Sequence, residues 1–156
     1  MIDVNGKVVM ISGANRGIGL AIARSLYKAG YSLSLGSRNI SSLENLIENS
    51  SQDRILNCHF DAMDKSTHKE WVRHTIDKFN KIDCLINNAG IVESVSVEDE
   101  EDNEDALDRM WTVNVKAPLS LTRLTLPYLK KSGSGRVVNV ASLAGKAVYG
   151  SSVGYS

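Results

Sequence analysis

Three glycines follow the first apolar stretch of the chain in a Gly-x-x-x-Gly-x-Gly spacing. In a turn of this kind between a strand and a helix, backbone N–H groups can approach a pyrophosphate, with the positive end of the helix dipole behind them. Leu20 follows the last glycine where a phosphate-binding P-loop needs Lys and a hydroxyl residue, which excludes that motif. We therefore predict that a dinucleotide contacts the residues of this turn: Gly13, Asn15, Arg16, Gly17, Ile18 and Gly19.

Four further motifs follow in chain order: Asn87-Asn88-Ala89-Gly90, then Asn114, Ser142, and Tyr155 thirteen residues after Ser142. Together with the glycine turn, they resemble the pattern of the short-chain dehydrogenase/reductase family over the whole chain. The resemblance implies a doubly wound parallel α/β sheet (Rossmann-type) with the cofactor across the carboxyl ends of its strands, and a nicotinamide-dependent oxidoreductase activity. The glycine turn most resembles that of 3-oxoacyl-carrier-protein reductases and their generalist relatives.

The choice between NAD and NADP can be argued from charge at the end of the second expected strand. An acid there would bond the ribose 2′-OH of NAD, whereas the 2′-phosphate of NADP needs that acid absent and an arginine near. Ser37 stands where the acid would be, Arg38 follows it, and Arg16 could reach the same phosphate. Either arginine alone would be read as a solvated surface charge, but together they favour NADP.

Other cofactor contacts are implied by the resemblance. Asp61, just past the third expected strand, resembles the family position that bonds the adenine amino group, with a surface turn acid as the alternative. By the same resemblance Asn88, Ala89 and Gly90 brace the fourth strand and place backbone at the ribose next to the nicotinamide. As bare sequence, those three residues indicate only a turn.

The reaction needs a group that exchanges a proton with the substrate oxygen and a donor that polarises it. By family resemblance Tyr155 is the acid/base, Ser142 orients the carbonyl, and Asn114 binds a water in the proton relay. A tyrosine, with an ordinary pKa of about 10, works near neutrality only beside positive charge. In the family that charge comes from the oxidised nicotinamide and from a lysine four residues after the tyrosine, beyond Ser156 in this chain. Lys146 does not match that position.

Alternating apolar stretches and helical periodicities should position these residues, as in a parallel α/β sheet. A proline at position 118 should bend the last and longest helical region, because it lacks an N–H, and either one kinked helix or two helices would fit. We expect Met63, Met110 and Trp111 in the core. The expected strands are 7–12, 31–36, 54–60, 83–86 and 136–140, and the expected helices are 17–29, 41–49, 66–79 and 104–131.

Composition limits the other possibilities. The 156 residues carry 18 Lys plus Arg against 18 Asp plus Glu, and the basic residues are scattered, which argues against a nucleic-acid partner. Neither a leader nor a membrane span is evident. The two cysteines, Cys58 and Cys84, show no disulfide or metal spacing, so we expect a reducing, cytoplasmic location. Seven acids in the eight residues 98–105 suggest a solvated run and no metal site.

We expect one dinucleotide-binding domain over residues 1–156, which stops just after the catalytic tyrosine and lacks the family's last strands. We therefore expect the sequence to be part of a longer NADP-dependent enzyme that interconverts a ketone and a secondary alcohol. The alternatives are an NADP-binding sensor without catalysis and, less well supported, a methyltransferase-type fold. A homo-oligomer, tetramer or dimer, could form through the long helix, where Leu119, Leu121 and Leu124 offer apolar positions.

Overall fold

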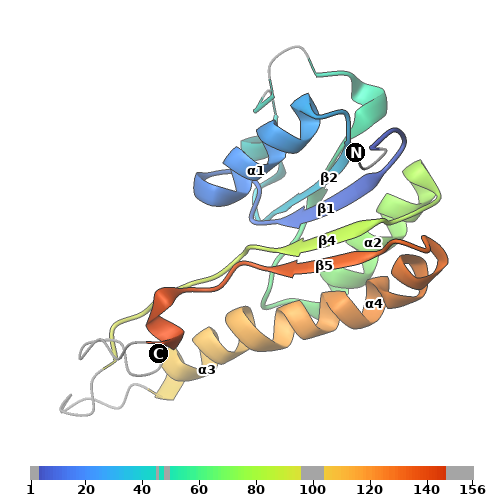
Figure 1. The fold of residues 1–156 in the computed structure, drawn as a ribbon. Coiled ribbons are helices and arrows are strands. Elements are labelled where there is room, and N and C mark those ends of the chain that lie inside the picture. The colour runs from blue at the N-terminus through green and yellow to red at the C-terminus, as the bar shows by residue number, and fades with distance from the viewer. Residues whose placement is uncertain (1–3, 45, 48–49, 96–103, 147–156) are drawn as a thin grey trace.

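Five parallel strands form one sheet in the order β3-β2-β1-β4-β5 (Figure 1). The computed structural model describes residues 4–44, 46–47, 50–95 and 104–146. The chain moves outward from β1 to β3 and then crosses to the other side of β1, so the order reverses between β1 and β4, where such sheets bind nucleotides. The strands are β1 (Val8–Ser12), β2 (Ser32–Ser37), β3 (Ile55–His59), β4 (Cys84–Asn87) and β5 (Arg136–Asn139).

Helices cover both faces of the sheet (Figure 1). On one face, α1 (Gly17–Lys28) packs with Leu43 and Ile47 against the apolar side chains of β1 and β2. On the other, α2 (Lys65–Phe79) and α4 (Ala117–Lys131) enclose a second cluster with Met10 and Leu85 from the sheet. The doubly wound parallel α/β sheet expected from the sequence is therefore confirmed.

The helix expected at 41–49 is wrong. The structure has a short 3-10 helix, Ile40–Leu43, and describes only part of the following segment. Its start is fixed by Asn39, whose side chain accepts hydrogen bonds from the Ser41 N–H at 3.1 Å and the Ser41 hydroxyl at 2.7 Å. Asn and Ser side chains bond nearby backbone in this way and so compete with regular helix formation.

The long helical region is interrupted before the proline. Helix α3 (Glu104–Trp111) and α4 are joined by a π-helical turn, Thr112–Lys116, and the N–H of Ala117 bonds the Thr112 carbonyl. Because Pro118 has no N–H, the carbonyl of Asn114 lacks the donor that an α-helix would supply four residues later. The interruption thus lies around Asn114, one turn earlier than the bend expected at Pro118.

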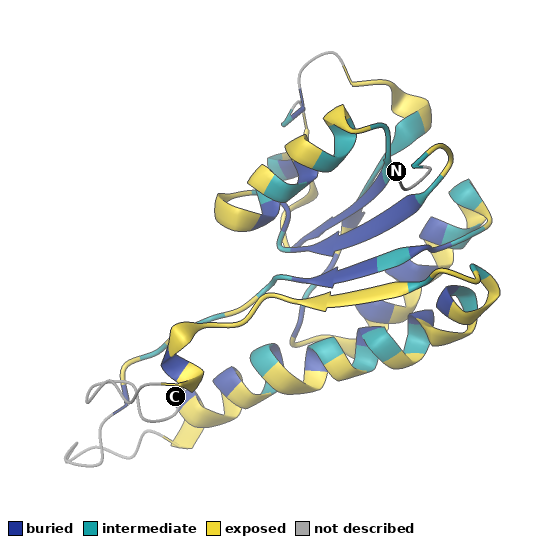
Figure 2. Ribbon diagram, in the orientation of Figure 1, coloured by how far each residue is buried: buried dark blue, intermediate teal, exposed yellow. Residues whose placement is uncertain are grey.

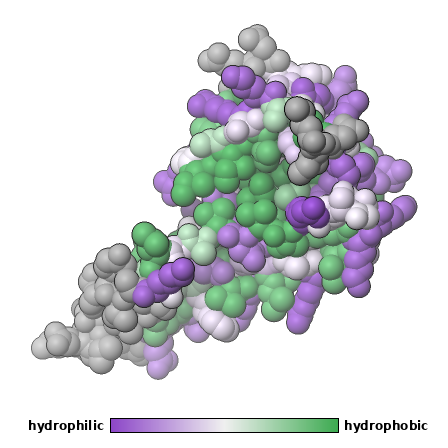
Figure 3. Space-filling view, in the orientation of Figure 1, coloured by the Kyte–Doolittle hydropathy of each residue, from purple (hydrophilic) through white to green (hydrophobic). Residues whose placement is uncertain are grey.

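Strand β5 forms an edge of the sheet and is exposed along its length (Figure 2). Apolar side chains gather over the middle of the same face in the space-filling view (Figure 3). Val138 is 45% exposed and Leu143, just beyond the strand, is 76% exposed. In the described part of the chain, no helix combines the length and apolar character needed to cross a membrane.

Several apolar side chains differ from expectation. Met110 is buried, but Met63 and Trp111 are about half exposed and so are not core residues. On α4, Leu121 is buried and Leu124 packs against the core, which leaves only Leu119 of the three expected interface positions exposed. Helix α4 therefore turns less apolar surface outward at these positions than its sequence suggested.

Candidate cofactor and active site

The glycine turn joins the carboxyl end of β1 to α1, beside the ends of β2 and β4 (Figure 1). The Gly13 N–H donates to the Gly36 carbonyl of β2 at 2.9 Å, and the backbone of Gly13 has a φ of +66°. A Cβ on Gly19 would overlap the Gly13 carbonyl oxygen and come within 2.5 Å of Asn88 Nδ2. The turn is therefore drawn tightly against its neighbours, as a cradle for a ligand's phosphates requires.

Helix α1 begins at this turn without a side-chain cap. Its N-cap residue, Arg16, has extended backbone and its side chain makes no capping hydrogen bond, and the first turn of the helix holds no acid. The first backbone N–H groups of a helix have no partner inside the helix, and the helix dipole is positive there. An anion is the ligand that this end suits best.

Asn88 and Ala89 brace the end of β4 against the end of β1. The N–H groups of both residues donate to Ser12 Oγ, each at 3.0 Å. The Asn88 side-chain amide donates to the carbonyls of Ser12 at 2.9 Å and Gly13 at 3.1 Å. This brace holds the glycine turn and the Asn88-Ala89-Gly90 segment together across the point where the strand order reverses.

A small polar segment follows β2. Ser37 is buried, and its hydroxyl lies 3.3 Å from that of Ser42, whose Oγ donates to the Asn39 carbonyl at 2.5 Å. Arg38 is exposed, and its carbonyl faces His59 Nδ1 at 2.9 Å. No carboxylate stands at the last residue of β2, where a buried serine is followed by an exposed arginine.

Asp61 is held through its backbone by the first turns of α2. Its N–H donates to Thr67 Oγ1 at 3.0 Å, and its carbonyl oxygen lies 3.0 Å from Nε2 of His68. The Asp61 carboxylate accepts the Met63 N–H at 2.9 Å, as in a local turn. The side chain thus has one local structural contact and still has capacity to accept a further hydrogen bond.

Asn114 lies on the π-helical turn and holds the segment after Gly90. Its Oδ1 accepts the Ile91 N–H at 2.9 Å, and its Nδ2 donates to the Ile91 carbonyl at 2.8 Å. A Cβ on Gly90 would lie 3.3 Å from Asn114 Oδ1. The Asn114 side chain therefore positions the Asn88–Ile91 segment. The backbone carbonyl of Asn114 has no α-helical donor, because residue 118 is proline and lacks an N–H.

Ser142 lies just beyond the carboxyl end of β5. The strand is aligned there by Asn87, whose side chain donates to Asn139 Oδ1 at 2.8 Å, and by the Val140 N–H, which bonds the Asn87 carbonyl. The Ser142 side chain is exposed and accepts the Ala144 N–H at 3.2 Å. Tyr155, the expected acid/base, lies outside the described residues.

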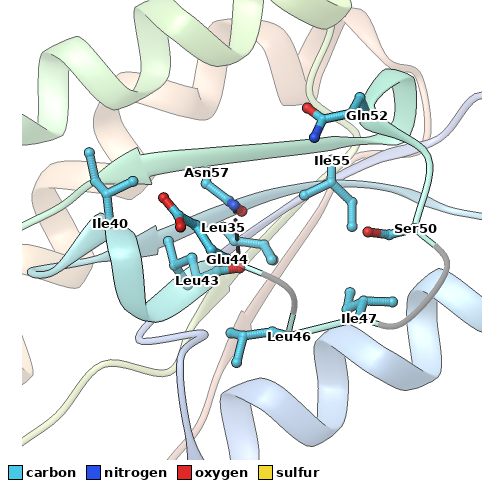
Figure 4. A pocket seen from close by; sticks show the side chains of 10 residues that line it. All are labelled: Leu35, Ile40, Leu43, Glu44, Leu46, Ile47, Ser50, Gln52, Ile55 and Asn57. Carbon is cyan, nitrogen blue, oxygen red and sulfur yellow. Dashed lines mark hydrogen bonds between the residues drawn. The ribbon is translucent and has the colours of Figure 1, made fainter.

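Other chemistry has little support among the described residues. Burial raises the pKa of both thiols, Cys58 and Cys84, to about 11, so neither is a ready nucleophile. No group of three or more possible metal ligands is found in this part of the chain. A hollow of about 460 Å³ between β2, β3 and the following 3-10 segment includes Leu35 and Asn57 in its lining (Figure 4). Its lining contains none of the predicted site residues.

Three residues that the sequence did not point to hydrogen-bond the backbone of predicted site residues. Ser12 receives both N–H groups of the brace, and Thr67 and His68 hold the backbone of Asp61. One signal was available for Ser12: a hydroxyl residue that ends a buried strand directly before the first glycine. Nothing in the sequence alone connects α2 to Asp61, because those contacts depend on how the helix packs.

A family model described as short chain dehydrogenase matches residues 7–156. The chain is 45% identical over 149 residues to an agropine synthesis reductase of Rhizobium rhizogenes. This alignment covers 96% of the present chain and 34% of the reductase. The chain is 35% identical over 157 residues to an uncharacterised oxidoreductase of Staphylococcus epidermidis, which covers 96% of this chain and 66% of that protein.

Two solved structures are also similar. A short-chain dehydrogenase from Streptomyces avermitilis has a TM-score of 0.86 and 29% identity, over 96% of this chain and 55% of that one. The KRED1-Pglu enzyme has a TM-score of 0.85 and 32% identity, over 96% of this chain and 62% of that one. The chain spans about a third of the length of the agropine synthesis reductases.

Proposed function

Because this chain belongs to the short-chain dehydrogenase family, a family of oxidoreductases, we propose that it binds NADP(H) and interconverts a ketone and a secondary alcohol. The observation that carries the proposal is the glycine cradle between β1 and β4, combined with the carboxylate-free end of β2. The cradle suits a pyrophosphate, and the end of β2 suits a 2′-phosphate better than a 2′-hydroxyl.

The residues fit such a cofactor from one end to the other. Backbone N–H groups of the Gly13–Gly19 turn would hold the pyrophosphate, with Ile18 exposed at the rim. Ser37, Arg38 and Arg16 would hold the 2′-phosphate, and Asp61 would accept a hydrogen bond from the adenine amino group. The Asn88–Gly90 backbone would line the ribose next to the nicotinamide. When bound, the nicotinamide supplies or accepts the hydride.

The substrate oxygen would meet two hydroxyl side chains. In the geometry described here the Ser142 hydroxyl accepts the Ala144 N–H, which leaves its own hydrogen to donate to a carbonyl oxygen. Tyr155 would deliver a proton to that oxygen in reduction and remove it in oxidation. Two hydroxyls on one oxygen would select a substrate with a carbonyl or alcohol group.

Asn114 would serve the proton relay through its backbone. Its side chain is already occupied by Ile91, but its carbonyl has no α-helical donor because residue 118 is proline. Ordered water is one of the partners that can satisfy a backbone carbonyl of this kind. We place the relay water at this carbonyl, from which a proton could pass toward the catalytic tyrosine.

The wider proposal concerns the whole protein. A small ketone or alcohol is the proposed substrate class, supported by the reductase and oxidoreductase names of the relatives. We also propose that the protein forms a homo-oligomer through α4, where Leu119 and Leu126 are exposed, and that it is located in the cytoplasm.

Calorimetric titration with NADP⁺ and NAD⁺ tests the cofactor assignment. Arg38→Ala should weaken NADP⁺ binding about tenfold or more and leave NAD⁺ binding nearly unchanged, since only NADP⁺ carries the 2′-phosphate. Arg123→Ala, an exposed arginine on α4, is the matched control and should change neither. Equal losses for both cofactors would refute the assignment.

Tyr155→Phe should abolish ketone reduction while the affinity for NADP⁺ stays intact.

A further inference from the structure

His59 ends β3 directly beside the proposed 2′-phosphate site. In the parallel register it is paired with Ser37, the last residue of β2. Its side chain is exposed, and its Nδ1 lies 2.9 Å from the carbonyl oxygen of Arg38. The imidazole is therefore held against the backbone of Arg38, the residue that the cofactor assignment depends on.

The partner of Nδ1 decides which tautomer the neutral ring adopts. A carbonyl oxygen can only accept, so Nδ1 must carry the hydrogen and donate it to Arg38. In the neutral ring Nε2 is then an acceptor, and within the described residues no hydrogen bond involves it. Protonation would make Nε2 a donor and give the ring a positive charge without breaking the bond to Arg38.

Charged groups face His59 from the neighbouring segments. Arg38 lies on the β2 side, Asp61 follows two residues later, and Asp64 is the N-cap of α2. Hydrogen bonds from the side chain and backbone of Ser66 lower the pKa of Asp64, and the charges of His68 and His59 add to this. Asp64 therefore stays ionised, and its carboxylate is close enough to His59 for the two charges to interact.

We propose that His59 is a specificity-determining residue of the cofactor site, whose protonation increases the preference for NADP(H) over NAD(H). The inference rests on the proposed function, because it concerns the same 2′-phosphate. A charged His59 attracts the phosphate of NADP(H), whereas a neutral His59 offers Nε2 as an acceptor to the 2′-hydroxyl of NAD(H). The same ring thus favours one cofactor or the other according to its charge.

Protonation adds a positive charge to an imidazole ring, so the preference should depend on pH. The ratio of the dissociation constants of NAD⁺ and NADP⁺ should fall about three- to tenfold between about pH 6 and pH 8. The phosphate itself gains charge over this range, since its second pKa is about 6, and so acts in the opposite direction. A falling ratio therefore cannot come from the phosphate.

Titration calorimetry at constant ionic strength, with NADP⁺ and NAD⁺ as probes, tests the proposal. His59→Gln keeps a donor for the Arg38 carbonyl but does not titrate, so its ratio should stay level or rise with pH. His59→Lys fixes a positive charge and should also abolish the fall in the ratio. His74→Gln, an exposed histidine on α2, is the control and should behave like the unaltered protein.

The outcomes separate this inference from the cofactor assignment. If Arg38→Ala removes the preference for NADP⁺ but His59→Gln retains the pH dependence of the unaltered protein, the role of His59 is refuted and the NADP site stands. If Arg38→Ala leaves the preference unchanged, the 2′-phosphate site is misplaced and the role of His59 falls with it. A ratio independent of pH in the unaltered protein would also overturn the proposal.

Discussion

A side chain at position 19 would enter space that two polar groups already fill. The Cβ of an alanine would overlap the Gly13 carbonyl oxygen, which is backbone and cannot turn aside, and would crowd Asn88 Nδ2. Gly19→Ala should therefore lower the free energy of unfolding by about 1–3 kcal/mol, although alanine normally favours a helix over glycine. It should also weaken NADP⁺ binding, because the turn must open. Urea unfolding and calorimetry would measure the two effects.

Gly145 provides the matched control for this substitution. A Cβ there would meet no atom of the described residues within 4 Å, so Gly145→Ala should change the free energy of unfolding by less than about 0.5 kcal/mol. If the two alanine variants were equally stable, the close packing of the glycine turn against Asn88 would not be what demands glycine at position 19.

The π-helical turn between α3 and α4 yields a prediction for an element. Pro118→Ala restores an N–H four residues after Asn114, which can then bond the Asn114 carbonyl as in an α-helix. The free energy of unfolding should rise by up to about 3 kcal/mol, while kcat for ketone reduction falls about tenfold or more as the relay carbonyl is occupied. Thermal unfolding and steady-state kinetics would measure the two changes.

The same helix contains the control. Pro127 lies inside α4, and Pro127→Ala restores a donor for the Arg123 carbonyl, far along the helix from Asn114. This variant should gain stability without losing kcat. An unchanged kcat in Pro118→Ala would remove Asn114 from the proposed relay, whatever happens to stability.

Elements with a clear apolar period were predicted well, and those governed by local polar contacts were not. The helix expected at 66–79 is observed at Lys65–Phe79, because apolar residues such as Val72 and Ile76 recur at helical spacing on the face that packs on the sheet. At 41–49 the apolar residues Leu43 and Ile47 are buried, yet Asn39 and the serines set a 3-10 turn. Periodicity reports which side chains are buried, but it does not report these competing hydrogen bonds.

The candidate site shows the same division. The glycine turn could be placed from its residue types and its position after a strand, and the Asn88–Gly90 segment from its resemblance to the family pattern. The contacts of Ser12 and His68 could not be predicted from the sequence. The Ser12 hydroxyl accepts the N–H of Asn88, 76 residues away, and the His68 ring contacts the Asp61 carbonyl, 7 residues away; both contacts depend on side-chain packing. The π-helical turn required the position of Pro118 to be read together with the contact between Asn114 and Ile91.

At the opposite end of the sheet from the cofactor site, Asp83 joins three parts of the whole molecule. Its buried carboxylate accepts the Val8 N–H of β1 at 2.9 Å, the Ser132 hydroxyl beyond α4 at 2.6 Å, and lysine ammonium groups at positions 7 and 81. Burial alone would raise the pKa of Asp83, but the hydrogen bonds from Ser132, Val8 and the two lysines outweigh it, and the pKa is lowered.

A lowered pKa in the folded state means that the unfolded chain binds the proton more readily. The stability that Asp83 contributes is therefore present above about pH 4, where an unfolded aspartate is ionised, and is lost as the pH falls through the lower folded value. Asp83→Asn should cost about 2 kcal/mol of unfolding free energy at pH 7, with the difference narrowing below about pH 4. Asp77→Asn, which removes an exposed carboxylate paired with Arg73, should cost less than about 0.5 kcal/mol. Urea unfolding between pH 7 and pH 3 would measure these differences in the free energy of unfolding. If the difference between Asp83→Asn and the unaltered protein were the same at every pH, the shape of the Asp83 side chain, and not its charge, would account for its contribution to stability.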